Sequence, residues 1–206
     1  MADEIETAEV AFTGTSRPGM AYLEWGAIFG GIAVACAISV VLMNFGAAVG
    51  LNVGNPLLAD GSASWNVLVA GLWVIVVSIS AASAGGYLSG RMRSRRDDAL
   101  ESEVEVRDGT HGLVVWAGST LIVAAIAGVS ALAGAFVAAV DTNGFEVTEQ
   151  TVRFTKNSSI IFAFATAAGP ALAAAAAWFS GISGGTHRDG GLSVHDVVPV
   201  MLRKRS

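Results

Sequence analysis

Residues 66–90 read NVLVAGLWVIVVSISAASAGGYLSG and contain no Asp, Glu, Lys, Arg or His. At about 1.5 Å per helical residue, this run is long enough to cross the roughly 30 Å of hydrocarbon in a bilayer. It lacks the alternation of barrel strands, and lipid offers no partner to bare backbone N–H and C=O groups. The run therefore predicts a transmembrane helix.

Three further uncharged runs of similar length flank this one, at residues 26–51, 112–140 and 159–182. The chain is 53% hydrophobic and only 14% charged, whereas a soluble domain has about 25% charged residues. We therefore predict an all-α integral membrane protein that crosses the bilayer four times. The predicted parts are an acidic N-tail (1–25), a four-helix transmembrane domain (26–182) and a C-tail (183–206).

The distribution of cations predicts the orientation. Ten Lys and Arg residues fall in the two tails and the middle loop, against only Arg153 and Lys156 in the loop after the third run. By the positive-inside rule both termini are expected in the cytoplasm. Because the N-tail is acidic, it does not resemble a cleaved signal peptide, and the first span is expected to be retained. The cations expected to set topology and contact anionic lipid headgroups are Arg91, Arg93, Arg95, Arg96, Arg203, Lys204 and Arg205.

The two halves of the chain align with each other. A shift of 95 residues lays Gly86 over Gly181, Gly90 over Gly185 and Arg93 over Arg188. This pattern is consistent with two duplicated helical hairpins of the same topology. It is equally what two unrelated helices rich in Ala and Gly would give.

Small residues recur every fourth position in the predicted spans. Helices in lipid associate by close backbone approach, which small residues permit. Two interpretations are open: an interface with a partner or a second copy, or packing inside the four-helix bundle. The predicted packing positions are Gly46, Gly50, Ser78, Ala82, Gly86, Gly90, Ala173, Ala177, Gly181 and Gly185.

The polar groups inside the spans are few. No ionisable side chain lies there, although transporters and pumps usually keep one at membrane depth. Asn44 is the best candidate for a hydrogen bond between helices. Pro170 is expected to kink the fourth span. Outside the spans, residues 51–65 predict turns, and residues 141–158 predict either a surface helix or an outward extension of the fourth span.

The middle loop concentrates ionisable residues. Glu101, Glu103 and Glu105 alternate, so an extended backbone would place three carboxylates on one side, with Asp108 and His111 nearby. No spacing is diagnostic of a metal, and a solvated acidic run is the usual explanation, so no metal or cofactor is predicted. Cys36 is the single cysteine, which excludes an intramolecular disulfide. No catalytic constellation is found, and a net charge of −5 argues against nucleic-acid binding.

Several stretches of the chain resemble a group of small bacterial four-helix membrane proteins labelled "PhnA-like". These stretches are WGAIFGGIAVACAISVVL (25–42), GLNVG (50–54), GGYLSGRMR (85–93) and DGTHGLVVWA (108–117). The resemblance covers roughly residues 22–140 and implies a bacterial inner membrane, but no reaction. The positions it marks for testing are Gly86, Gly90, Arg91, Asp108, His111 and Gly112.

The function expected from the sequence is that of a noncatalytic membrane scaffold or accessory protein. It would associate through its Gly and Ala helix faces with a second copy or with another membrane protein. The alternative is a small oligomeric channel or carrier for an ion or small solute, with Asn44 and the serines lining the pore. A cytoplasm-facing enzyme or metal sensor is the least favoured reading.

Overall fold

The structure is a computed structural model, and it describes residues 22–49, 65–94, 100–140 and 149–192. This part of the chain is helical, with no strand. All four helices contain a stretch long and apolar enough to cross a membrane, which fits a multi-pass membrane protein. In chain order they are α1 (Trp25–Ala48), α2 (Trp65–Met92), α3 (Glu101–Val140) and α4 (Glu149–Asp189).

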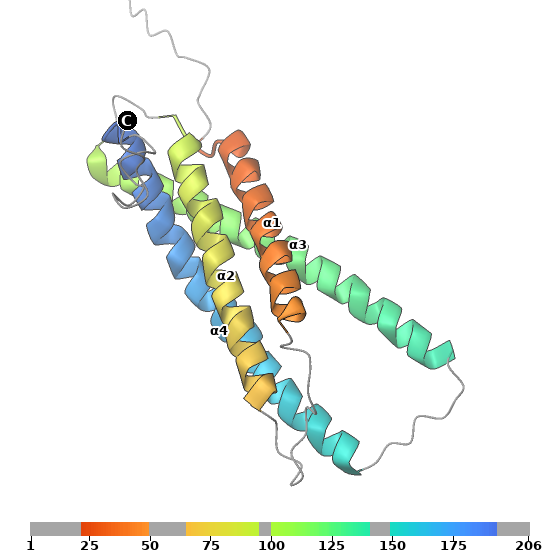
Figure 1. Ribbon diagram of the computed structural model, residues 1–206. Coiled ribbons are helices and arrows are strands. Elements are labelled where there is room, and N and C mark those ends of the chain that lie inside the picture. The colour runs from red at the N-terminus through yellow and green to blue at the C-terminus, as the bar shows by residue number, and fades with distance from the viewer. Residues whose placement is uncertain (1–21, 50–64, 95–99, 141–148, 193–206) are drawn as a thin grey trace, which may run out of the picture.

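The helices alternate in direction, so that α1 and α3 begin where α2 and α4 end (Figure 1). Glu24, just before α1, accepts a hydrogen bond from Ser94, just after α2. Arg188, in the last turn of α4, donates to the Gly90 carbonyl near the end of α2. These contacts bring the polar ends of all four helices together, and we call this end of the bundle the polar end.

Helices α2 and α4 form the most extensive helix pair, and glycine is what lets them approach. A methyl group added at Gly86 would lie 2.7 Å from the Ala177 carbonyl oxygen, and one at Gly90 would collide with the Gly181 carbonyl. Here the backbone of one helix rests directly on the backbone of the other. In lipid, where apolar burial supplies no attraction, this close packing replaces a hydrophobic core.

The first halves of α1 and α3 complete the bundle in the same way. Gly31 of α1 faces Gly85 of α2, so that a methyl group at Gly31 would lie 2.6 Å from the Gly85 carbonyl oxygen. Gly112 of α3 packs against the backbone of Ala177. The apolar residues enclosed by this packing are small or medium in size: Ile28, Ala35, Ala81, Val115, Ala173 and Ala177.

Most of the small residues predicted from their spacing therefore serve packing within the chain. Ala82, Gly86, Gly90, Ala173, Ala177 and Gly181 lie between helices, and Gly185 lies against the Asp108 carboxylate. Ser78 donates to Val74 of its own helix and lies beside Gly169. Gly46 is buried, while Gly50 lies outside the described residues. A partner could bind these faces of α2 and α4 only if the bundle opened first.

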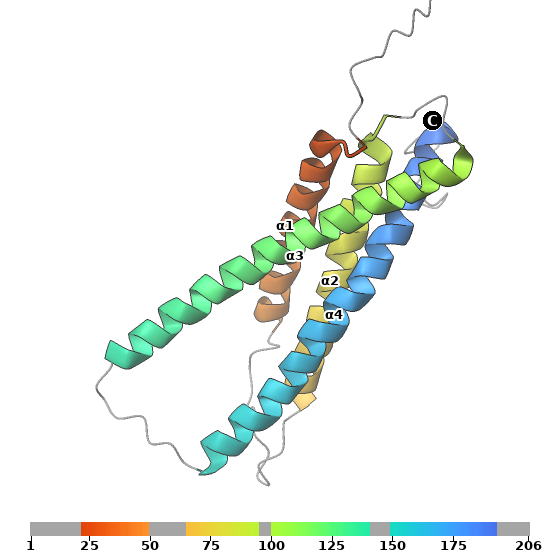
Figure 2. The same cartoon turned by 180° about the vertical axis from the view of Figure 1, so that it is seen from behind.

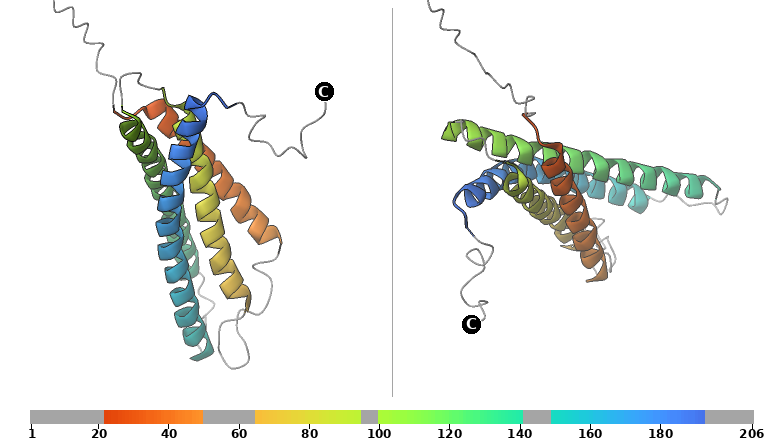
Figure 3. Two further views of the ribbon diagram at one scale, coloured as in Figure 1. Left: turned by 90° about the vertical axis from the view of Figure 1, so that its left-hand side faces the viewer. Right: turned by 90° about the horizontal axis from the view of Figure 1, so that it is seen from above.

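Helix α3 leaves the other helices in its second half. Figures 2 and 3 show it crossing the bundle obliquely and separating from α1 and α4. Every residue from 121 to 130 is exposed, and a methyl group at Gly128 would meet nothing within 4 Å. The first half of the same helix is packed, as Val115 is fully buried. Helix α3 is therefore anchored at the polar end and free beyond it.

The structure changes one local expectation and resolves one open alternative. Asn44 does not reach another helix: its Nδ2 donates to the Val40 carbonyl, 2.8 Å away, because an i to i−4 bond is available on its own exposed helix face. Helix α4 continues through Pro170. It also begins at Glu149, so the later part of the 141–158 loop extends α4 outward. The predicted turns of residues 51–64 lie outside the described residues.

Gly86→Leu is expected to disrupt the bundle, because its side chain must displace the backbone of α4. We expect a loss of at least about 1–3 kcal/mol in the free energy of unfolding, seen as a lower melting temperature in mild detergent. Leu88→Ala on the same helix, where no backbone contact depends on a small residue, serves as control and should cost less than about 1 kcal/mol. Equal stability of the two variants would contradict the backbone contact.

Candidate functional site

Asp108 is the centre of the polar end. Its side chain, on the third turn of α3, is almost completely buried. It accepts a hydrogen bond from Nε of Arg93, which directly follows α2, and the Arg93 guanidinium is itself buried. It also accepts from both terminal nitrogens of Arg188 in α4, at 3.3 and 3.4 Å. One carboxylate thus joins three helices.

Glycine makes room for this carboxylate. A methyl group at Gly185 of α4 would occupy the position of an Asp108 carboxylate oxygen, and one at Gly181 would lie 2.6 Å from the Asp108 carbonyl oxygen. Because α3 and α4 are in backbone contact at Gly181, the short aspartate side chain reaches Arg188 of α4. Burial of an ion pair costs several kcal/mol of desolvation, which only good geometry and additional hydrogen bonds repay.

Arg188 has a second role as a cap. Besides Asp108 it binds the carboxylate of Asp189 at 2.8 and 3.0 Å, and it donates to the carbonyls of Gly90 and Arg93 at 2.8 and 3.0 Å. The last carbonyls of a helix have no partner within the helix and carry partial negative charge. Arg188 of α4 therefore closes the carboxyl end of α2.

A separate set of contacts holds the start of α1. The Glu24 N–H donates to Nε2 of His111 at 2.9 Å, and the Glu24 carboxylate accepts from the N–H and hydroxyl of Ser94 at 3.0 and 2.7 Å. Arg107 donates from Nε to the Tyr22 carbonyl at 2.7 Å and stacks over the Tyr22 ring. We call Tyr22, Glu24, Ser94, Arg107 and His111 the α1 clasp.

The hydrogen bonds fix the state of the His111 ring. Because Nε2 accepts from a backbone N–H, it carries no proton. The other nitrogen, Nδ1, is 2.7 Å from the Arg107 carbonyl and must donate to it. His111 is fully buried and neutral in this arrangement.

The predicted headgroup-contacting arginines take different positions. Arg93 was expected at the lipid surface but is 1% exposed, because Asp108 draws its guanidinium between the helices. Arg91 reaches the Leu192 carbonyl beyond α4. The remaining cations of that prediction lie outside the described residues: Arg95, Arg96, Arg203, Lys204 and Arg205.

The alternating glutamates are not on one side of an extended strand. Helix α3 begins at Glu101, so Glu101 and Glu105, four residues apart, share one face of the helix, and Glu103 points away from it. Within the described residues, no group of three His, Cys, Asp or Glu side chains is arranged to hold a metal ion.

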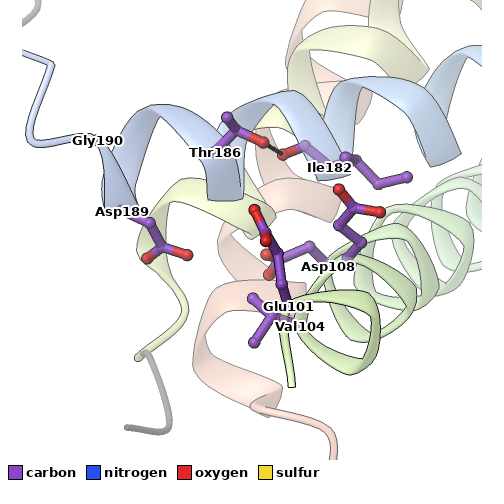
Figure 4. Close-up of a pocket in the computed structure, with 8 residues that line it drawn as sticks. Glu101, Val104, Asp108, Ile182, Thr186, Asp189 and Gly190 are labelled. Carbon is purple, nitrogen blue, oxygen red and sulfur yellow. Dashed lines mark hydrogen bonds between the residues drawn. The ribbon is translucent and has the colours of Figure 1, made fainter. Parts of the chain in front are cut away.

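A polar pocket of about 340 Å³ lies between the start of α3 and the end of α4 (Figure 4). Glu101, Glu105, Asp108 and Asp189 line it, together with Thr186, which donates to the Ile182 carbonyl. Asp108 and Asp189 are already bound to Arg188, so two of the four carboxylates are neutralised. The arrangement offers acidic groups at a water-accessible end but no nucleophile with a paired base.

A second cavity, of about 260 Å³, lies deeper, where all four helices contribute to the wall. Ser39, Ser78 and Ser119 line it, and each donates to a carbonyl of its own helix. The rest of the lining is Trp116, Thr120, Thr166, Pro170 and small aliphatic residues, with no ionisable side chain. Asn44 does not line this cavity.

Sequence reasoning missed the ion pairs around Asp108. One signal for them was available: the 95-residue shift superimposes Arg93 and Arg188, and both arginines bind the same carboxylate in the structure. The positions marked by the resemblance also gather at the polar end. Gly90 and Gly112 pack on α4, and Asp108 and His111 lie on neighbouring turns of α3. Comparisons with family models, with curated proteins and with solved structures give no match for this chain.

Asp108→Asn should destabilise the protein strongly, because it leaves the buried Arg93 guanidinium without a counter-charge. We expect a loss of about 3–5 kcal/mol in the free energy of unfolding, measured by thermal or denaturant melting in mild detergent. Asp189→Asn is the matched control: its pair with Arg188 is partly exposed, and its loss should cost at most about 1 kcal/mol. If Asp189→Asn destabilised the protein as much as Asp108→Asn, the buried ion pairs of Asp108 would not be the main stabilising interaction at the polar end.

Proposed function

We propose that this chain is a noncatalytic integral membrane scaffold or accessory protein that associates through a helix face. The observation that carries the proposal is the free second half of α3, whose residues 121–130 are all exposed. Gly128 and Ala124, which also lines the second cavity, lie four residues apart there, the spacing that allows two helices to approach in lipid. The equivalent faces of α2 and α4 are already used inside the bundle.

The placement in the cell is part of the same proposal. Ten cations against two support cytoplasmic termini, and the resemblance to the PhnA-like group supports a bacterial inner membrane. The convergence of Arg93 and Arg188 on Asp108 supports the duplication of two hairpins, since aligned residues of the two halves do the same work. The partner in the bilayer is a second copy or another membrane protein.

The alternative, a small channel or carrier, is favoured by the cavity among the four helices. The wall of this cavity carries hydroxyl groups from residues that lie within the candidate membrane-spanning helices. The absence of an ionisable residue from this wall argues for a neutral solute over an ion. Solute flux into liposomes by the purified protein, lost on Ser78→Leu, would favour this alternative over the scaffold.

Cross-linking tests the scaffold proposal. A photo-reactive residue at Val129, which is 67% exposed, should give an adduct of doubled mass in vesicles if the partner is a second copy. In native membranes it should give one discrete protein adduct if the partner is another protein. Gly128→Leu should reduce the adduct at least fivefold, because its side chain blocks close approach.

Gly26→Leu is the matched control for this experiment. Gly26 is exposed on α1, and a methyl group there also meets nothing within 4 Å. The same change therefore adds the same bulk at a position with no proposed partner. The adduct should survive in this variant. Lipid adducts alone at Val129, or equal loss in both leucine variants, would overturn the proposed interface.

A further inference from the structure

The α1 clasp contains a titratable group in an unusual position. His111 belongs to α3, yet its Nε2 accepts the N–H of Glu24, the residue that caps the start of α1. The Glu24 side chain makes no capping bond to its own helix, since its carboxylate is bound by Ser94. The imidazole therefore supplies from another helix an acceptor for a backbone donor at the amino end of α1.

Protonation of His111 is incompatible with this contact. A protonated imidazole has two N–H donors and no acceptor, so Nε2 and the Glu24 N–H would both present hydrogens at 2.9 Å. The added positive charge would also face the amino end of α1, which already carries partial positive charge from the aligned peptide dipoles. Both effects push the start of α1 away from α3.

The charges around the ring act in the same direction overall. Burial disfavours the charged ring most, and the cations of Arg93 at the end of α2 and Arg107 on the preceding turn of α3 act in the same direction. The Arg107 carbonyl that accepts from Nδ1 and the Glu24 carboxylate favour the charged ring. The Glu24 carboxylate is shared with Ser94 and with Arg107, whose terminal nitrogen lies 3.9 Å away. From α4, Arg188 is bound to Asp108 and Asp189, so its charge is already paired.

We propose that the His111–Glu24 contact is an acid-sensitive latch that holds the amino end of α1 on the polar end of the bundle. Because the closed latch requires a neutral ring, acid favours the open form. Well above about pH 6.5, the ordinary pKa of a histidine in water, the ratio of closed to open forms does not depend on pH through His111. Below that pH, each unit lowers the ratio of closed to open forms by up to about tenfold.

Hydrogen exchange of the full chain in lipid nanodiscs tests the latch. Mass spectrometry would follow peptides that contain residues 22–28 at pH 7.5 and pH 5.5, with labelling times scaled for the intrinsic pH dependence of exchange. We expect protection of this segment to fall at least fivefold at pH 5.5. Peptides from residues 81–90 of α2, packed on α4 by glycine contacts, should keep their protection.

Two variants separate the histidine from the nearby carboxylate. His111→Gln keeps a side chain of similar reach that does not titrate. The protection of residues 22–28 should therefore change less than twofold between pH 7.5 and pH 5.5, whether or not glutamine still binds the Glu24 N–H. Glu24→Gln keeps the backbone N–H and removes the carboxylate, so the response should persist. A wild-type segment insensitive to pH, or a full response in His111→Gln, would overturn the latch.

Discussion

A buried carboxylate shared by two arginines is the constraint on which the polar end depends. Asp108 cannot lie unpaired among packed helices, and neither can the guanidinium of Arg93, so each requires the other to stay in place. Arg188 then adds a third helix to the pair and closes the carboxyl end of α2. The position of α2, α3 and α4 relative to one another is thus specified by charge at one end and by shape along the rest.

Shape and charge are coupled through glycine. An aspartate side chain is short, and it reaches Arg188 of α4 where α3 and α4 touch through their backbones at Gly181 and where Gly185 leaves room for the carboxylate. Without the arginines, close approach of the helices would leave the last carbonyls of each helix without hydrogen-bond donors. Small residues and ionic residues are therefore parts of one arrangement, although they look unrelated along the sequence.

The sequence predicts the four apolar runs and their helical state well, because length and the absence of charge are properties of single segments. It predicts contacts between segments poorly. Arg93 looks like any other juxtamembrane cation, and only the approach of α3 makes it a buried partner of Asp108. The prediction for Asn44, a hydrogen bond to another helix, is wrong because the Val40 carbonyl of its own helix already accepts from it. The glycines of α2 and α4 pack against other helices, whereas Gly128 contacts none. This difference depends on where α3 lies relative to the other helices, and no local sequence pattern specifies that.

The length of α3 has a consequence for the membrane around it. Its uncharged part, residues 112–140, measures roughly 43 Å along the axis, well beyond the roughly 30 Å of hydrocarbon in an average bilayer. A helix that exceeds the hydrocarbon thickness tilts, and the 24-residue α1, roughly 36 Å long, exceeds it by less than α3 does. Since both are held together at the polar end, unequal tilts would carry their far ends apart in the opposite leaflet. The thickness of the surrounding lipid would therefore act on the distance between the free half of α3 and the rest of the bundle.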